Sequence, residues 1–204
     1  MPSASLDPMM TPPAASESGT RGRTRRAILS AAASALARNR ATTLAEIADA
    51  ADVGRTTLHR YFPDRDGLIK ATIDDSVQAI ERSVSHAALD QGPPQEAMRR
   101  LVAAMVDVGD RLMFLFGDPR VLEGHPSAGP PMTAEDPTIA LIERGQADGV
   151  FDPQVSAVWI RHVLWALVYT GVEEAASGRL PRHGVTSTVI RTFENGIVVG
   201  ASPA

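Results

Sequence analysis

Apolar residues recur along the chain at the three- and four-residue spacing of helices, and no stretch keeps the alternation of a β-strand. Leu44, Ile47, Ala48 and Ala51 give the clearest example, at positions i, i+3, i+4 and i+7. This spacing places all four side chains on one face of an α-helix. The same analysis over the whole chain predicts an all-α protein of about nine helices.

Proline and glycine mark the ends of several expected helices. Pro63 and Gly149, for example, follow helical patterns, and both residue types commonly end helices. The expected helices cover residues 23–37, 44–51, 55–62, 65–89, 95–116, 138–148, 155–177 and 185–198.

Two of these helices are short and meet at a turn over residues 52–54. Thr43 and Glu46 stand in the Ser/Thr-x-x-Glu relation of a capping box, in which each side chain satisfies a free amide of the first helical turn. Leu58 and Phe62 lie four residues apart and would anchor the second short helix from its inner face. This arrangement fits the helix-turn-helix motif, whose second helix enters the major groove of DNA.

Charge is distributed unequally along the chain. Residues 21–65 contain nine arginines against four acidic residues, a net charge of +5, whereas residues 71–204 contain ten arginines against seventeen acidic residues, a net charge of −7. A basic head on an acidic body predicts that only the head contacts a polyanion such as DNA. The alternative is a solvated charged surface that binds nothing.

The segment TTLAEIADAADVGRTTLHRYFPDRDGLI, residues 42–69, resembles the N-terminal DNA-binding domain of TetR-type bacterial transcriptional regulators. The resemblance extends over residues 23–80, and the rest of the chain is similar in helical architecture alone. It implies a helix-turn-helix DNA-binding domain over 21–68 and a helical ligand-binding and dimerisation domain over 69–204. The proline, serine, alanine and threonine content of residues 1–20 predicts a disordered N-terminal tail.

Hydrogen-bond donors to DNA are available on the outer face of the second short helix and on the basic arm that precedes the motif. The resemblance implies base contacts by Arg55 and Thr56, and phosphate contacts by Thr43 and Arg65. The arm could instead be merely solvated, and Tyr61 could be a surface aromatic without a partner. The candidate DNA-binding residues are Arg23, Thr43, Arg55, Thr56, Thr57, His59, Arg60, Tyr61 and Arg65.

The segment 155–172 is apolar nearly all round, so a helix there must be covered on most sides. The resemblance implies a homodimer formed by the helices at 155–177 and 185–198. It also implies a ligand-responsive regulator that binds a near-palindromic operator and is released by a small hydrophobic effector. A repressor is favoured over an activator. The alternative is a helical small-molecule-binding or interaction module without useful affinity for DNA.

Methionine and aromatic residues on two body helices could line an effector pocket, because such pockets are mostly apolar with few polar groups. The alternative is that these methionine and aromatic side chains only pack in the hydrophobic core. The candidates are Met105, Met113, Phe116, His162, Trp165 and Tyr169, with Phe114 and Trp159 as further possibilities.

Several functional classes find no support in the sequence. The chain has no cysteine, and its five histidines form no H-E-x-x-H motif, so we expect no metal site, no cofactor and no enzymatic activity. Arg161 and His162 interrupt the most apolar segment, which argues against a membrane span. The first twenty residues lack the apolar core of a secretion signal, so we expect a cytoplasmic protein.

Overall fold

The computed structural model describes residues 15–123 and 136–197. The prediction of an all-α fold is confirmed, and the described residues form α-helices joined by short turns and two 3-10 helices. In chain order these are α1 (Ala15–Arg38), α2 (Leu44–Ala50), α3 (Arg55–Tyr61), α4 (Arg65–His86), α5 (Pro94–Asp107), α6 (Gly109–Phe116), η1 (Pro119–Val121), α7 (Pro137–Ala147), α8 (Ala157–Ala176), η2 (Arg182–Gly184) and α9 (Val185–Ile197).

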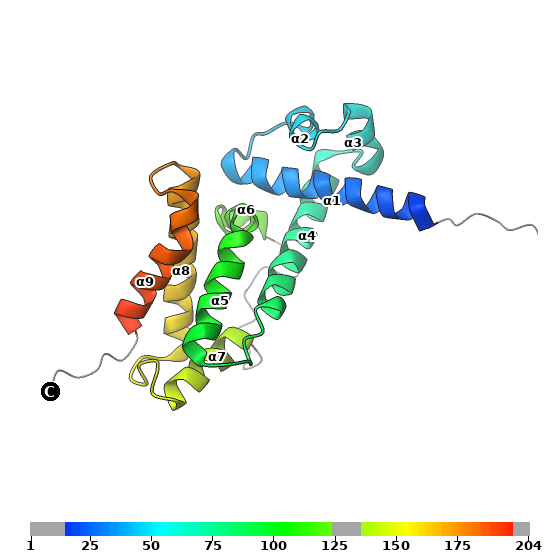
Figure 1. The fold of residues 1–204 in the computed structure, drawn as a ribbon. Coiled ribbons are helices and arrows are strands. Elements are labelled where there is room, and N and C mark those ends of the chain that lie inside the picture. The colour runs from blue at the N-terminus through cyan, green and yellow to red at the C-terminus, as the bar shows by residue number, and fades with distance from the viewer. Residues whose placement is uncertain (1–14, 124–135, 198–204) are drawn as a thin grey trace, which may run out of the picture.

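The head consists of α1, α2, α3 and the first turns of α4. Figure 1 shows α2 and α3 packed above α1, with α4 descending from the head into the body. Ile28 on α1, Ile47 on α2, Leu58 on α3 and Leu68 on α4 are fully buried in one cluster. The apolar stripes of these helices therefore meet in a single small core, which fixes the angle between α2 and α3.

The first helix is longer than expected. We predicted a disordered tail over residues 1–20, but α1 begins at Ala15, and residues 1–14 lie outside the described part of the chain. Inside the added turns, Thr20 accepts a hydrogen bond from Arg23 at 2.9 Å, and its carbonyl accepts one from the Thr24 hydroxyl at 3.1 Å. Extending an existing helix adds one hydrogen bond for each residue fixed, so the packed segment of α1 can propagate into this polar stretch.

The body packs α5, α7, α8 and α9 around a second core, with α8 and α9 lying side by side on the edge away from α4 (Figure 1). Leu101, Ile142, Leu164, Val189 and Phe193 are buried in this cluster. The body core is therefore a cluster distinct from the head core.

One expected helix is divided in two. The prediction of a single helix over residues 95–116 was wrong, because the chain bends at Val108 and continues as α6. A Cβ atom on Gly109 would lie 2.7 Å from a methyl carbon of Val172, so the bend brings the start of α6 against α8 where only glycine fits. The apolar spacing continues through the bend, which is why the pattern did not reveal it.

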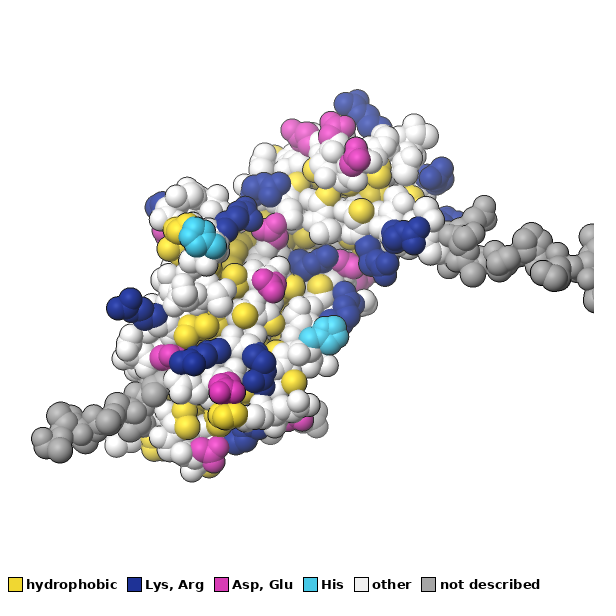
Figure 2. Space-filling model, viewed as in Figure 1, with side chains coloured by type: hydrophobic (Ala, Val, Ile, Leu, Met, Phe, Trp, Pro, Cys, Tyr) yellow, Lys and Arg dark blue, Asp and Glu magenta, His cyan; other side chains and the backbone are white. Residues whose placement is uncertain are grey.

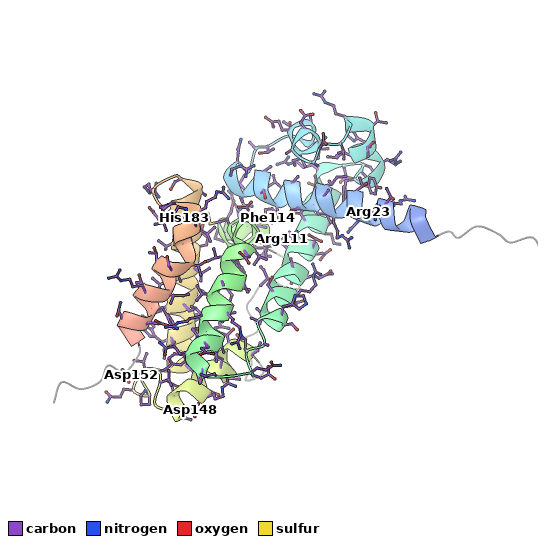
Figure 3. The ribbon with its side chains drawn as sticks, in the orientation of Figure 1. Arg23, Arg111, Phe114, Asp148, Asp152 and His183 are labelled. Carbon is purple, nitrogen blue, oxygen red and sulfur yellow. The ribbon has the colours of Figure 1, made fainter. Side chains whose placement is uncertain are left out.

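Helix α6 connects the two cores. Phe114 and Leu115 are buried in the head cluster, while Leu112 is buried in the body cluster. Figure 3 shows Phe114 at the junction between α1 and the body. The remaining expected helices are present with small shifts at their ends; α4, for instance, ends at His86, and Ala88 just beyond it takes a positive φ of 47°.

Candidate functional site

The predicted capping box at the start of α2 is present. The Thr43 hydroxyl accepts a hydrogen bond from the Glu46 N–H at 3.2 Å, and the Glu46 carboxylate accepts one from the Thr43 N–H at 2.7 Å. The Glu46 carboxylate also accepts a hydrogen bond from the Thr43 hydroxyl at 2.8 Å. The bond from the Thr43 N–H, and after it the bond from the hydroxyl, lower the pKa of the Glu46 carboxyl. The box fixes where α2 begins and therefore how it braces α3.

The turn between α2 and α3 depends on Asp52, whose φ of 52° lies in the left-handed region. Glycine adopts this conformation most easily, and aspartate tolerates it better than most residues. The Val53 N–H then donates to the Ala48 carbonyl at 3.0 Å and closes the turn. Gly54 follows as the N-cap of α3.

The faces of α3 are divided as predicted between core and solvent. Leu58 is fully buried and Phe62, just after the helix, is nearly so. Thr57 and Tyr61 are half-buried. The exposed side chains are those of Arg55, Thr56, His59 and Arg60. The helix therefore presents a polar, cationic face to solvent while its apolar face holds it to the head.

Arginines of α1 continue this basic surface across Tyr61. The guanidinium groups of Arg21 and Arg60 lie 5.9 and 5.8 Å from the centre of the Tyr61 ring, and that of Arg25 lies 5.6 Å from the centre of the Phe62 ring. Figure 3 shows Arg23 on the part of α1 that projects beyond the head, and Figure 2 shows basic side chains around that end of the molecule. The aromatic pair thus joins the basic arm to the exposed face of α3.

Arg65 has a structural role that the sequence did not indicate. Its guanidinium donates hydrogen bonds to the backbone carbonyls of Thr42 and Arg40, in the loop between α1 and α2. The side chain therefore holds this loop against the start of α4. The contact with DNA phosphate that the resemblance implies for Arg65 stays a prediction.

An apolar cavity of about 1450 Å³ lies in the body, between α4, α6, α7 and α8. Its wall includes Phe116 from α6 together with Trp165 and Tyr169 from α8. Phe116 keeps 52% of its surface exposed because the ring faces this space and not the core. The volume is sufficient for a drug-sized organic molecule.

The pocket candidates divide into two groups. Phe116, His162, Trp165 and Tyr169 line the cavity. Met105 and Met113 do not line it, because α5 turns its apolar face into the body core, where Met105 is buried, and Met113 packs against the same core. Of the further candidates, Phe114 is buried in the head core and Trp159 is 61% exposed on α8, outside the cavity wall.

Sequence reasoning missed the charged groups of the cavity. Arg161, which is only 2% exposed, forms an ion pair with Asp136, and their nearest atoms are 2.5 Å apart. Arg144 donates to the carbonyls of Leu89 and Asp90 at 2.8 and 2.7 Å and so ties α7 to the turn after α4. An arginine within an apolar helix was a usable signal, because a buried charge needs a partner.

Arg40 connects the head loop to α6 next to the cavity. Its guanidinium donates to the carbonyls of Met113 and Phe114 at 3.2 and 2.6 Å and lies 5.3 Å from the centre of the Phe114 ring. Burial is the main cause that lowers the pKa of Arg40. A Cβ atom on Gly117 would lie 3.3 Å from both Arg40 Nη2 and the Tyr169 hydroxyl, so a cavity residue and a head residue share this corner.

Comparison with known proteins agrees with this geometry. A family model described as bacterial regulatory proteins, tetR family, matches residues 28–72, which span α2 and α3. The transcriptional repressor LfrR of Mycolicibacterium smegmatis is 34% identical over 182 residues, which are 89% of this chain and 94% of LfrR. The chain belongs to the TetR family. It is thus a DNA-binding transcriptional regulator and not an enzyme, as the sequence predicted.

Two other similarities extend the comparison of this TetR-family chain. The transcriptional regulator NfxB of Pseudomonas aeruginosa is 28% identical over 156 residues, 76% of this chain and 83% of NfxB. The crystal structure of LfrR from Mycobacterium smegmatis in complex with proflavine superposes with a TM-score of 0.69 at 33% identity, covering 89% of this chain and all of that chain. The similarity therefore includes the body as well as the head.

Two features are absent from the described residues. No helix among them is long and apolar enough to cross a membrane. They also hold no group of three or more histidine, cysteine or acidic side chains that could bind a metal ion.

Proposed function

We propose that this TetR-family protein is a ligand-responsive repressor that binds a near-palindromic operator as a homodimer and is released by a small, largely apolar effector. The observation that carries the proposal is the position of the cavity, which shares α6 with the head core. A ligand in the cavity would touch the same short helix that supports the DNA-binding head.

The exposed face of α3 supports the DNA contact. Arg55 and Thr56 stand at the start of α3, where they can reach base edges, and His59 and Arg60 follow on the same exposed side. The N-cap position of Thr43 and the arm around Arg23 would add contacts to the phosphate backbone.

The outer face of α8 supports the dimer. Trp159 is 61% exposed, and Val163 and Leu167, which follow at i+4 and i+8 on the same side of α8, are only partly covered. Large apolar side chains on one edge mark a contact surface, and a second copy related by a two-fold axis would cover α8 and α9 of both chains. Pairing the heads would also let two α3 helices read successive half-sites.

The corner at Arg40 supports a route for release. A ligand that displaces Phe116 or Tyr169 would disturb the end of α6, whose last carbonyls Arg40 holds. Such a ligand shifts the equilibrium between DNA-binding and released conformers only by its difference in affinity for the two. Moving from mostly bound to mostly free needs about 5 kcal/mol of that difference.

The test is a gel-retardation titration with DNA from upstream of the gene, at two salt concentrations. Specific binding that weakens steeply with salt is expected, because arginines displace counterions from phosphate. The double variant Arg55→Ala, Tyr61→Ala should lose specific binding, while Arg99→Ala in the body should retain it. If the double variant binds as wild type does, α3 does not read the operator. If wild type itself shows no specific binding, a small-molecule-binding module without DNA affinity becomes the better account.

A further inference from the structure

The basic side chains of the cavity are already engaged within the protein. The lining charges are Glu81, Asp90, Asp136, Arg144 and Arg161. Arg161 is paired with Asp136, and Arg144 donates two hydrogen bonds to carbonyls of the α4–α5 turn. An anionic ligand would therefore have to compete with these internal acceptors for either guanidinium.

The acidic side chain of Glu81, unlike these two guanidinium groups, is not engaged by other protein groups among the described residues. Glu81 lies on the stripe of α4 that lines the cavity, next to the apolar residues Val77, Ile80 and Val84, and its side chain is exposed to solvent at the cavity's edge. Among the described residues its carboxylate has no ion-pair or hydrogen-bond partner. Asp90 is the other unpaired acidic residue of the wall. It lies at the turn to which Arg144 donates a hydrogen bond, so the positive charge of Arg144 partly offsets the negative charge of Asp90. Glu81 is the lining charge that protein groups leave uncompensated.

We propose that the cavity selects planar aromatic cations over anions of the same shape, and that the Glu81 carboxylate is the counter-charge. A ligand that covers this carboxylate removes its water, which costs free energy unless the ligand supplies a compensating charge. An anion would instead bring like charges together in a space walled by apolar groups. Phe116, Trp165 and Tyr169 supply the aromatic surface that a flat ring system would contact.

This inference rests on the proposed effector role of the cavity and goes beyond it by naming the ligand's charge and the residue that recognises it. The LfrR structure in complex with proflavine supports the choice of an acridine as the probe.

Three acridines test the inference: proflavine, a cation at neutral pH; acridine, which is neutral; and acridine-9-carboxylate, an anion. Their dissociation constants are measured by fluorescence titration of the full chain at low salt. Wild type should bind proflavine most tightly and the carboxylate most weakly. Glu81→Gln should weaken proflavine by roughly two- to fivefold, the range for a solvent-exposed charge pair, leave acridine nearly unchanged and strengthen the carboxylate, because only the charge interaction is removed.

Glu143→Gln is the matched control, because Glu143 is exposed on α7 and lies outside the cavity wall. It should leave the order and spacing of the three affinities unchanged. The inference is overturned if proflavine fails to bind, if wild type binds cation and anion equally, or if Glu81→Gln weakens acridine as much as proflavine. Operator retardation without ligand tests the proposed function separately, and release by acridine as strong as by proflavine would uphold that function while rejecting the charge selection.

Discussion

The core of the head is fully buried, with no exposed surface on Ile28, Ile47, Leu58 or Leu68. The body, in contrast, contains a cavity of about 1450 Å³ that is lined by α4, α6, α7 and α8. Both regions are helical, but the head packs closely around one core, whereas the body leaves a cavity beside its own core. A surface that reads DNA must hold its donors in fixed positions, and close packing supplies that rigidity. A site for an effector needs space and groups that can move.

The difference extends to the polar groups. In the head, a capping box and the hydrogen bonds of Arg65 fix the ends of short helices. In the body, Phe116 stays half-exposed, and the Glu81 carboxylate makes no hydrogen bond or ion pair with another described residue. We interpret the first arrangement as a fixed reading head and the second as a site that is completed by its ligand.

The largest expected effect comes from truncating one large apolar side chain in each region, a buried one in the head and a half-exposed one in the body. Leu58→Ala should lower the free energy of unfolding by about 2–5 kcal/mol, since it leaves a void in a closed core. Phe116→Ala should cost about 1 kcal/mol or less, because half of the ring already faces open space. Urea unfolding of both variants measures the contrast. Equal losses would mean that the two regions are packed alike.

The next effect concerns the connection between the regions. Arg40→Met removes the hydrogen bonds to the end of α6 while keeping a long apolar stem beside Phe114. Operator and proflavine affinities should each stay near wild type, but the factor by which proflavine weakens operator binding should fall by about tenfold, or about 1.4 kcal/mol of coupling. Arg99→Met, at an exposed ion pair with Glu194, is the matched control and should leave the coupling intact.

The sequence was a good guide to the head because its signals are local. The Thr43–Glu46 box, the four-residue spacing of Leu58 and Phe62, and the turn at Asp52 each involve neighbours in the chain. Short-range hydrogen bonds and helix periodicity therefore predicted the elements and their exposed face. The contacts with DNA itself remain predictions.

The body was harder because its decisive contacts join residues far apart in sequence. Nothing near Met105 shows that α5 faces the core and not the cavity, and nothing near Val108 shows that α6 must pack against Val172. The contact of Arg40 with Phe114 spans 74 residues. Such pairings follow from how helices dock, which periodicity does not encode.

A smaller effect is expected at the N-terminus of α2, where Thr43 caps the helix. Thr43→Ala removes the N-cap acceptor and should lower the free energy of unfolding by about 1 kcal/mol, whereas Thr43→Ser should keep most of it. Thermal or urea unfolding checks both. If the serine and alanine variants are equally destabilised, the hydroxyl does not cap α2 and the loss lies in the packing of the threonine methyl.

The smallest effect is at the exposed turn after α6. Hydrogen bonds from the Arg120 side chain, and then from its backbone, lower the pKa of Asp118 from 3.8 to about 2. The stabilisation from this pair is present above pH 3.8 and lost as the pH falls towards 2. Arg120→Ala should move the pKa of Asp118 upward in a carbon-13 NMR titration while hardly changing stability at neutral pH, since Arg120 is exposed. An unchanged pKa would mean that the pair is not formed in solution.

The central claim is that the cavity and the DNA-binding head are coupled, and one reciprocal titration tests it most directly. Operator affinity is measured with and without saturating proflavine, and proflavine affinity is measured with and without saturating operator. The account predicts that each ligand weakens the other by the same factor, within the roughly 5- to 150-fold range of such couplings. Operator affinity that is unchanged at saturating proflavine would contradict it.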